Sequence, residues 1–223
     1  MGCDMKILKT LALAGTMAMM AGTSFAATVK AEHKGTSGRT DITYTYNGTT
    51  TKNASAGQFA MKGSNTTIGN LTGDFVAFCV DLAQTIKSPT TYTIKNDLFN
   101  TTIAGKIQNL FDSSYKTDLT QNQNAAFQIA LWETIYGKNF SSSSLSSTVN
   151  GFLNAANNWD NNTPKIWDLT FLYGHGTNPK SQNLVAVDKA PQPAPVPLPA
   201  AGFLLLGGLG GLGIVARRRT NAA

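Results

Sequence analysis

The first half of the chain alternates apolar and polar residues in the manner of half-buried β-strands. Arg39–Asn47 places an isoleucine and two tyrosines between threonines, and Asn47-Gly48 closes the run with a turn signal. Asp74–Leu82 is the most apolar segment of this region and predicts a buried central strand. Further strands are predicted at Thr28–Lys34, Gln58–Met61 and Thr91–Ile94.

A period of three to four residues replaces this alternation in the middle of the chain. Gln121–Tyr136 carries the clearest apolar stripe, and Gly137 supplies a stop signal at its end. Ile103–Phe111 and Leu145–Asn158 predict two further helices. Strand patterns return at Ile166–Tyr173 and Asn183–Val187. The order predicts an α+β fold: a largely antiparallel β-sheet or sandwich with a helical insert of two to three helices.

The N-terminal residues 1–26 have the pattern of a signal peptide. Lys6 and Lys9 precede a short apolar run, and small residues at Ser24 and Ala26 suit a signal peptidase. We expect cleavage between Ala26 and Ala27, which leaves residues 27–189 as one extracytoplasmic domain.

The C-terminal residues predict a membrane anchor. Residues 190–199 are a proline-rich linker, residues 200–216 are apolar and uncharged, and residues 217–223 begin with three arginines. A run of this length is near the lower limit for a transmembrane segment, and arginines are typical of its cytoplasmic end.

The net charge of +6 comes mostly from the two ends. The remainder carries a charge of only about +2 and shows no basic cluster, so we expect no nucleic-acid partner. The sequence contains no phosphate loop, zinc-ligand spacing or calcium loop, and we therefore expect no cofactor and no metal.

The mature chain is predicted to hold one cysteine. Of the two cysteines, Cys3 lies in the signal peptide, which leaves Cys79 in an oxidising compartment. A lone thiol there is buried and inert, paired with another chain, or consumed in other chemistry.

The C-terminal tail resembles the VPLPA subclass of PEP-CTERM sorting signals, because a short motif, an apolar segment and a basic end occur in that order. The matching residues are Val196, Pro197, Leu198, Pro199, Ala200, Arg217, Arg218 and Arg219. The resemblance implies export in a Gram-negative bacterium and recognition by an exosortase, a membrane transpeptidase that removes the tail. The protein would be anchored in the inner membrane before processing, and would then reach the cell surface or the extracellular matrix. An ordinary membrane anchor is the alternative.

Two internal segments resemble the halves of bacterial thioester (TQXA-type) adhesin domains. Phe78-Cys79-Val80-Asp81 matches an aromatic-Cys-x-Asp strand, and the segment from Gln128 to Trp132 matches a Gln-x-Ala-x-Trp helix. The resemblance implies a thioester between Cys79 and Gln128 and covalent attachment to a surface or polysaccharide target. Phe127 stands where family members typically have threonine.

The residue types suit that chemistry. A thiolate is nucleophilic enough to attack a carboxamide, and glutamine can release ammonia. A stored thioester needs a dry site, so we expect Phe78, Phe127 and Trp132 to wall it and Ala130 to permit close packing of helix and strand. Asp81 either assists the chemistry or anchors a loop.

Two other functions remain open. One is a structural envelope or matrix protein in which Cys79 is buried and inert. The other is a cysteine hydrolase with His175 as the base, which requires Cys79 and His175 within hydrogen-bonding reach. The adhesin instead requires Cys79 against Gln128.

Overall fold

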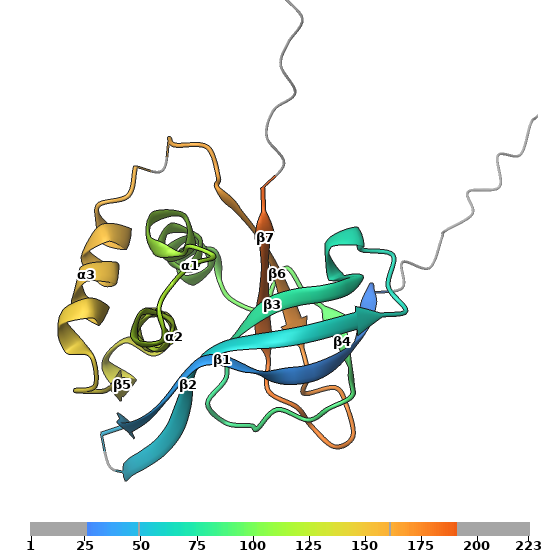
Figure 1. Cartoon of the computed structure of the whole chain (residues 1–223), viewed down its shortest axis with the longest axis horizontal. Helices are drawn as coiled ribbons and strands as arrows, with labels where there is room; N and C mark the ends of the chain where they lie inside the picture. Colours follow the sequence, from blue (N-terminus) through green and yellow to red (C-terminus); the bar gives the residue numbers. More distant parts are fainter. Residues whose placement is uncertain (1–25, 49, 161, 191–223) are drawn as a thin grey trace, which may run out of the picture.

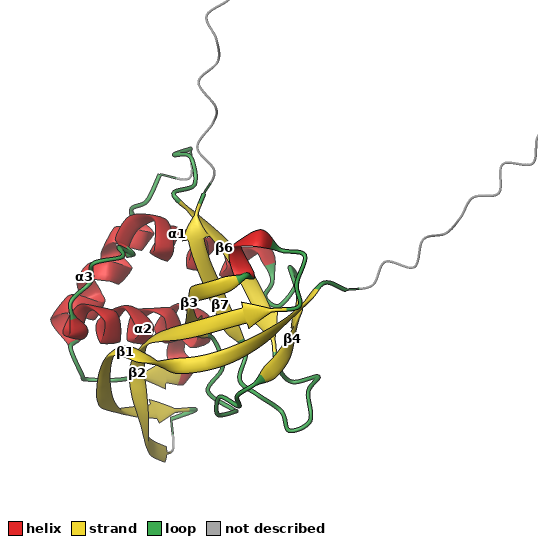
Figure 2. Ribbon diagram, turned by 45° about the vertical axis from the view of Figure 1, so that its right-hand side comes forward, coloured by secondary structure: helices red, strands yellow, loops and turns green. Residues whose placement is uncertain are grey.

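A computed structural model describes residues 26–48, 50–160 and 162–190. The predicted signal peptide up to residue 25, the sorting motif and the apolar segment at residues 200–216 lie outside the described residues. Within them the fold is α+β, with three α-helices beside a seven-stranded sheet whose pairings are all antiparallel (Figures 1 and 2). This architecture confirms the predicted class.

The sheet closes on itself. Its strands are β1 (Thr28–Tyr46), β2 (Thr50–Ser64), β3 (Gly73–Cys79), β4 (Thr90–Ile94), β5 (Phe140–Ser141), β6 (Trp167–Tyr173) and β7 (Leu184–Lys189). They run in the order β2-β3-β7-β6-β4-β1-β5, and β1 also pairs with β2. Six strands therefore form a ring of antiparallel pairs, which leaves β5 as a short addition to β1.

The first hairpin is longer than the sequence predicts. The strands predicted at Thr28–Lys34 and Arg39–Asn47 form one strand, β1, which ends at Tyr46. It continues through two register shifts, between His33 and Gly35 and between Ser37 and Thr40. The short strand expected at Gln58–Met61 is part of the 15-residue β2. The stretches between the predicted strands carry no strand pattern of their own, and pairing along the whole hairpin satisfies their backbone groups.

The strands differ from the prediction in two further ways. The central strand β3 ends at Cys79, three residues before the expected end at Leu82. The two-residue β5 was not predicted, because so short a segment carries no detectable alternation.

The helices follow local signals closely. They are α1 (Thr101–Ser114), α2 (Gln121–Tyr136) and α3 (Ser146–Asn157), with short 3-10 turns η1 (Gly69–Leu71) and η2 (Gly137–Asn139). Asn100 caps α1. Thr120 and Gln123 form a capping box at the start of α2, and Gly137 ends that helix with a positive φ.

Helix α2 is buried on all sides rather than along one stripe. Every residue from Asn124 to Trp132 is buried. Helices α1 and α3 pack against α2, as do the hairpin strands β1 and β2 (Figure 1). A helix enclosed on every side is apolar around its circumference, so its stripe of large residues marks only part of its contact surface. Among the described helices, none is long and apolar enough to cross a membrane.

Candidate functional site at Cys79 and Gln128

The carboxamide of Gln128 occupies the place of a missing strand beside Cys79. The ladder between β2 and β3 stops at Phe59 and Ala77, two residues before Cys79. Beyond that point the Cys79 N–H donates to Gln128 Oε1 at 2.9 Å, and Gln128 Nε2 donates to the Cys79 carbonyl oxygen at 2.8 Å. Gln128 is only 1% exposed. Helix α2 thus presents an amide that pairs with the strand edge as a neighbouring backbone would.

The thiol of Cys79 is buried on the same residue whose backbone binds this amide. Cys79 is 4% exposed, and its Sγ donates to the Asp81 carbonyl oxygen at 2.9 Å. Side chains of an extended strand stand roughly perpendicular to its backbone hydrogen bonds, so the sulfur rises from the plane that contains the carboxamide. A nucleophile attacks an amide carbon from above that plane. Burial raises the pKa of the thiol to about 12, and the hydrogen bond to the Asp81 carbonyl oxygen and the nearby indole N–H of Trp132 oppose that rise.

Three residues of α2, spaced four apart, face the segment that begins at Cys79. The first is Gln128. The second, Trp132, lines the same cavity as Cys79. The third, Tyr136, accepts the Leu82 N–H at 3.0 Å and donates to the Val80 carbonyl oxygen at 3.4 Å. Residues four apart share one face of a helix, so this face of α2 binds the chain from Cys79 to Leu82.

Asp81 anchors the loop that follows β3. Its buried carboxylate accepts the Ala83 N–H at 2.8 Å and the Asn183 N–H at 3.4 Å, and it pairs with Nε2 of His175. The carboxylate therefore ties the loop after β3 to the loop between β6 and β7. Among the described residues, the side chain of His175 pairs with Asp81, whereas Cys79 forms hydrogen bonds with Gln128 and with the Asp81 carbonyl oxygen.

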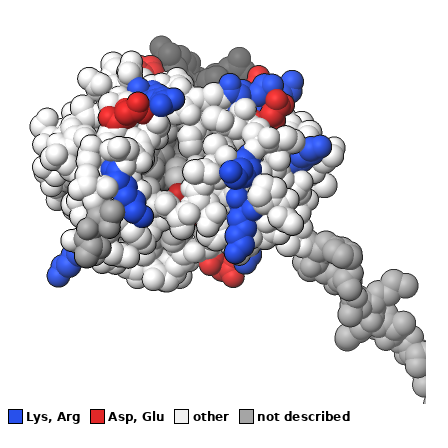
Figure 3. All heavy atoms as spheres, turned by 90° about the horizontal axis from the view of Figure 1, so that it is seen from below, with Lys and Arg blue, Asp and Glu red and all other residues white. Residues whose placement is uncertain are grey.

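A cavity of about 380 Å³ leads from the surface to Cys79. Its outer part is lined by Arg39 and Asn53 of the β1–β2 hairpin, which are exposed, and its inner part by Cys79 and Trp132. Arg39 forms an ion pair with Asp41, so its charge is locally compensated. One hollowed face of the molecule is mostly uncharged, with separated groups of lysine and arginine (Figure 3). Such a passage suits the entry of a small group on a target.

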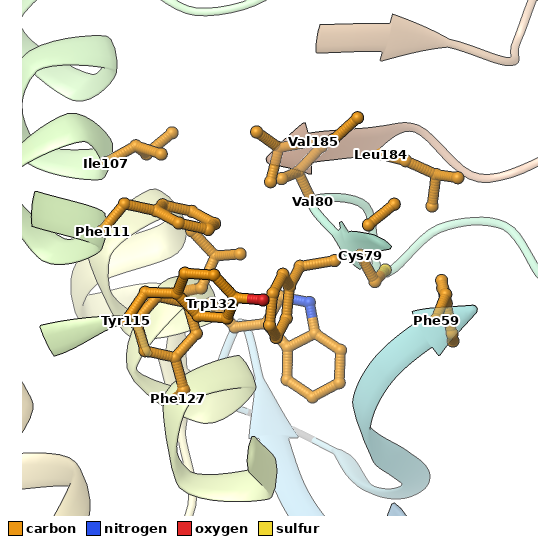
Figure 4. Packing of buried hydrophobic residues seen from close by; sticks show 14 of the residues in the cluster. Phe59, Cys79, Val80, Ile107, Phe111, Tyr115, Phe127, Trp132, Leu184 and Val185 are labelled. Atoms are coloured by element: carbon orange, nitrogen blue, oxygen red, sulfur yellow. The ribbon is translucent and has the colours of Figure 1, made fainter. Parts of the chain in front are cut away.

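The structure places Phe78 and Phe127 away from this cavity. Consecutive strand residues point to opposite faces, so Phe78 turns from Cys79 toward the helices. Its ring packs on Phe127 at a centroid distance of 5.1 Å and also contacts Phe111 and Tyr115. Figure 4 shows these three partner rings grouped together. Of the three aromatic residues expected to wall the thiol, only Trp132 lines the cavity.

The remaining predicted residues divide into two groups. Ala130 is fully buried in α2, and its carbonyl oxygen accepts the Thr134 hydroxyl. Ala26 and Ala27 precede β1, and the sorting residues from Val196 onward lie outside the described residues.

Several residues of the site were not predicted from the sequence. Tyr44 and Phe59 line the cavity from the hairpin, and only the fold brings them there. Tyr136 had a signal, because it lies two further turns along the face that carries Gln128. The pairing of His175 with Asp81 joins residues 94 positions apart and had no sequence signal.

The described residues contain no group of three or more metal-ligating side chains. Comparisons of the chain with protein-family models, with curated proteins and with solved structures found no match.

Proposed function

We propose that Cys79 and Gln128 form an internal thioester, and that the protein uses this bond to attach itself covalently to a target surface. The observation that carries the proposal is the buried carboxamide of Gln128, held against Cys79 by two hydrogen bonds of 2.9 and 2.8 Å. These bonds hold the Gln128 carboxamide against the backbone of the residue that carries the thiol, and proximity of this kind favours an intramolecular reaction.

Formation of the bond requires no external reagent. The sulfur attacks the Gln128 carbonyl carbon, a C–S bond forms, and the carbonyl oxygen becomes an oxyanion. The C–N bond then breaks, the thiol proton moves to the departing nitrogen, and ammonia leaves. Burial of Cys79 and Gln128 supports the proposal further, because a thioester that is shielded from water by the surrounding protein is protected from hydrolysis.

Target capture uses the same carbonyl carbon as the electrophile, with sulfur now as the leaving group. A nucleophile that enters by the cavity attacks the carbonyl carbon, forms a new bond to it, and displaces the sulfur, which takes up the nucleophile's proton. The product is a covalent link from Gln128 to the target and a free Cys79 thiol. The exposed outer lining at Arg39 and Asn53 supports this route, since it connects the thiol to solvent.

Intact-mass analysis tests the bond directly. The purified protein should weigh one ammonia less than its sequence, and Cys79→Ala should restore the full expected mass. Added methylamine should open the bond and increase the mass by one methylamine. A parent chain of full mass, with a thiol that alkylates after denaturation, would refute the proposal.

A second candidate is a structural envelope or matrix protein with an inert thiol. One observation favours it: burial raises the pKa of Cys79 to about 12, so only about one thiol in 10⁴–10⁵ is ionised near neutral pH. The mass measurement separates the two candidates, because an inert thiol retains the ammonia of Gln128.

We also propose that the chain is exported by its N-terminal segment and sorted through its C-terminal tail by an exosortase. The support is the sequence pattern of residues 1–26 and 196–219. N- and C-terminal sequencing of the protein from producing cells tests this proposal. We expect an N-terminus at Ala27 and a C-terminus near Pro199, whereas a retained arginine end would indicate a simple anchor.

A further inference from the structure

The indole N–H of Trp132 is a buried donor without an acceptor. Trp132 is 2% exposed, and its Nε1 has no hydrogen-bond partner among the described residues. Leaving such a group unpaired costs about 1–3 kcal/mol. A phenylalanine would avoid this cost, so the unpaired N–H needs a physical explanation.

The position of this donor relates it to Cys79 and Gln128. Trp132 lies one helical turn after Gln128 on the same face of α2 and lines the cavity that contains Cys79. Figure 4 shows the indole nitrogen on the side of the ring that faces Cys79. The N–H is close enough to the sulfur to affect its ionisation, although the sulfur is not a hydrogen-bond acceptor for it.

A second donor already points at the oxygen that will become charged. The Cys79 N–H donates to Gln128 Oε1 at 2.9 Å. When the sulfur attacks the carbonyl carbon, this oxygen gains a full negative charge and can accept more hydrogen bonds. Oriented N–H donors in a dry site stabilise such an oxyanion strongly, because they require no reorganisation during the reaction.

We infer that the Cys79 N–H and the Trp132 indole N–H together form an oxyanion hole for the reactions at the Gln128 carbonyl carbon. The inference rests on the proposed thioester. A tetrahedral oxyanion forms at this oxygen twice: when sulfur displaces ammonia, and when an incoming nucleophile displaces sulfur. In both steps the Trp132 N–H donates to the oxygen and neither gains nor loses a proton. Its unpaired state before reaction is the cost of holding a donor ready for the transition state.

Trp132→Phe removes the donor, and Trp167→Phe is the matched control. Trp167 also has an Nε1 without a partner, but it lies on β6, packs against Tyr115 and does not line the cavity. The full chain, purified in detergent, is mixed with methylamine, and the rate of bond opening is followed by intact mass. We expect Trp132→Phe to open about 10²-fold more slowly or worse, since loss of one oxyanion donor has this effect. Trp167→Phe should match the parent.

An isosteric replacement covers the case in which Trp132→Phe fails to fold. The chain has three tryptophans, so Trp159→Phe/Trp167→Phe leaves only Trp132. In that chain, incorporation of benzothienylalanine replaces the indole N–H by sulfur and preserves the ring shape. We expect slow opening by methylamine with an unchanged or raised unfolding midpoint, because the unpaired donor is gone.

The outcomes distinguish the inference from the proposed function. If the parent lacks one ammonia, and both altered chains react with methylamine at the parent rate, the oxyanion hole is refuted and the thioester stands. If the parent has its full mass, the thioester and the oxyanion hole are both refuted.

Discussion

Replacement of Gln128 by glutamate should make the stability of the fold depend on pH. Glutamate has the shape of glutamine, but one of its oxygens must face the Cys79 carbonyl oxygen, where Gln128 Nε2 now donates at 2.8 Å. Only the protonated acid can supply that hydrogen. The ionised form would bury a charge and oppose two oxygen atoms. Folding should therefore raise the pKa of Glu at this position above its usual value near 4.3.

The sign and size of the effect follow from linkage. A folded-state pKa above the unfolded value means that stability is fully present below about pH 4.3 and is lost as the pH rises. The loss is about 1.4 kcal/mol per pH unit until the folded pKa is reached. If that pKa is near 7, the variant loses about 3.5 kcal/mol between pH 4.3 and pH 7. The free energy of unfolding of native proteins is typically about 5–15 kcal/mol, so the change is easily measured.

Urea unfolding at several pH values between 4.5 and 7.5 measures this loss. The Cys79→Ala background is used throughout, because it keeps the backbone groups that bind Gln128 and prevents thioester formation. Gln123→Glu is the control: Gln123 Oε1 accepts the Thr120 N–H at the start of α2, where a carboxylate is favoured. The stability of the control should change little in this range, because a favoured carboxylate loses its contribution only as the pH falls below about 4.3. Equal pH dependence of Gln128→Glu and the background would show that the amide does not bind the Cys79 carbonyl.

Three further predictions follow from single features of the structure. If the thiolate is the attacking species, the rate of thioester formation in refolded protein should rise about tenfold per pH unit between pH 7 and 9, because burial raises the pKa of Cys79 to about 12. The rate is measured as loss of ammonia by intact mass, and a rate independent of pH would contradict this. Thr120→Ala should lower the free energy of unfolding by about 1 kcal/mol, since it removes the N-cap of α2; Thr117→Ala, in the preceding turn, is the control in the same urea titration. Asp112→Ala should lower the free energy of unfolding by about 3 kcal/mol or more, because its buried carboxylate accepts the Ile166 and Trp167 N–H groups at 3.0 and 2.9 Å. The thermal midpoint should fall with it, whereas the control Asp118→Ala should leave the midpoint almost unchanged.

Local interactions explain which parts of the fold were predictable. Helix α2 has the bounds expected from its period and from Gly137, because stop signals and periodicity act over a few residues. The hairpin was predicted only in fragments. Its register shifts and the length of β2 depend on pairing between strands, which leaves no complete pattern in either segment.

The candidate site shows the same division. The sequence by itself predicted Cys79 on a buried strand and Gln128 on a helix, and the two motifs suggested that they meet. Only the tertiary structure decided how. Cys79 and Gln128 are 49 positions apart, and β2 leaves the edge of β3 just where the carboxamide enters. Hydrogen bonds of buried groups fix that geometry, because a buried polar group without a partner costs free energy.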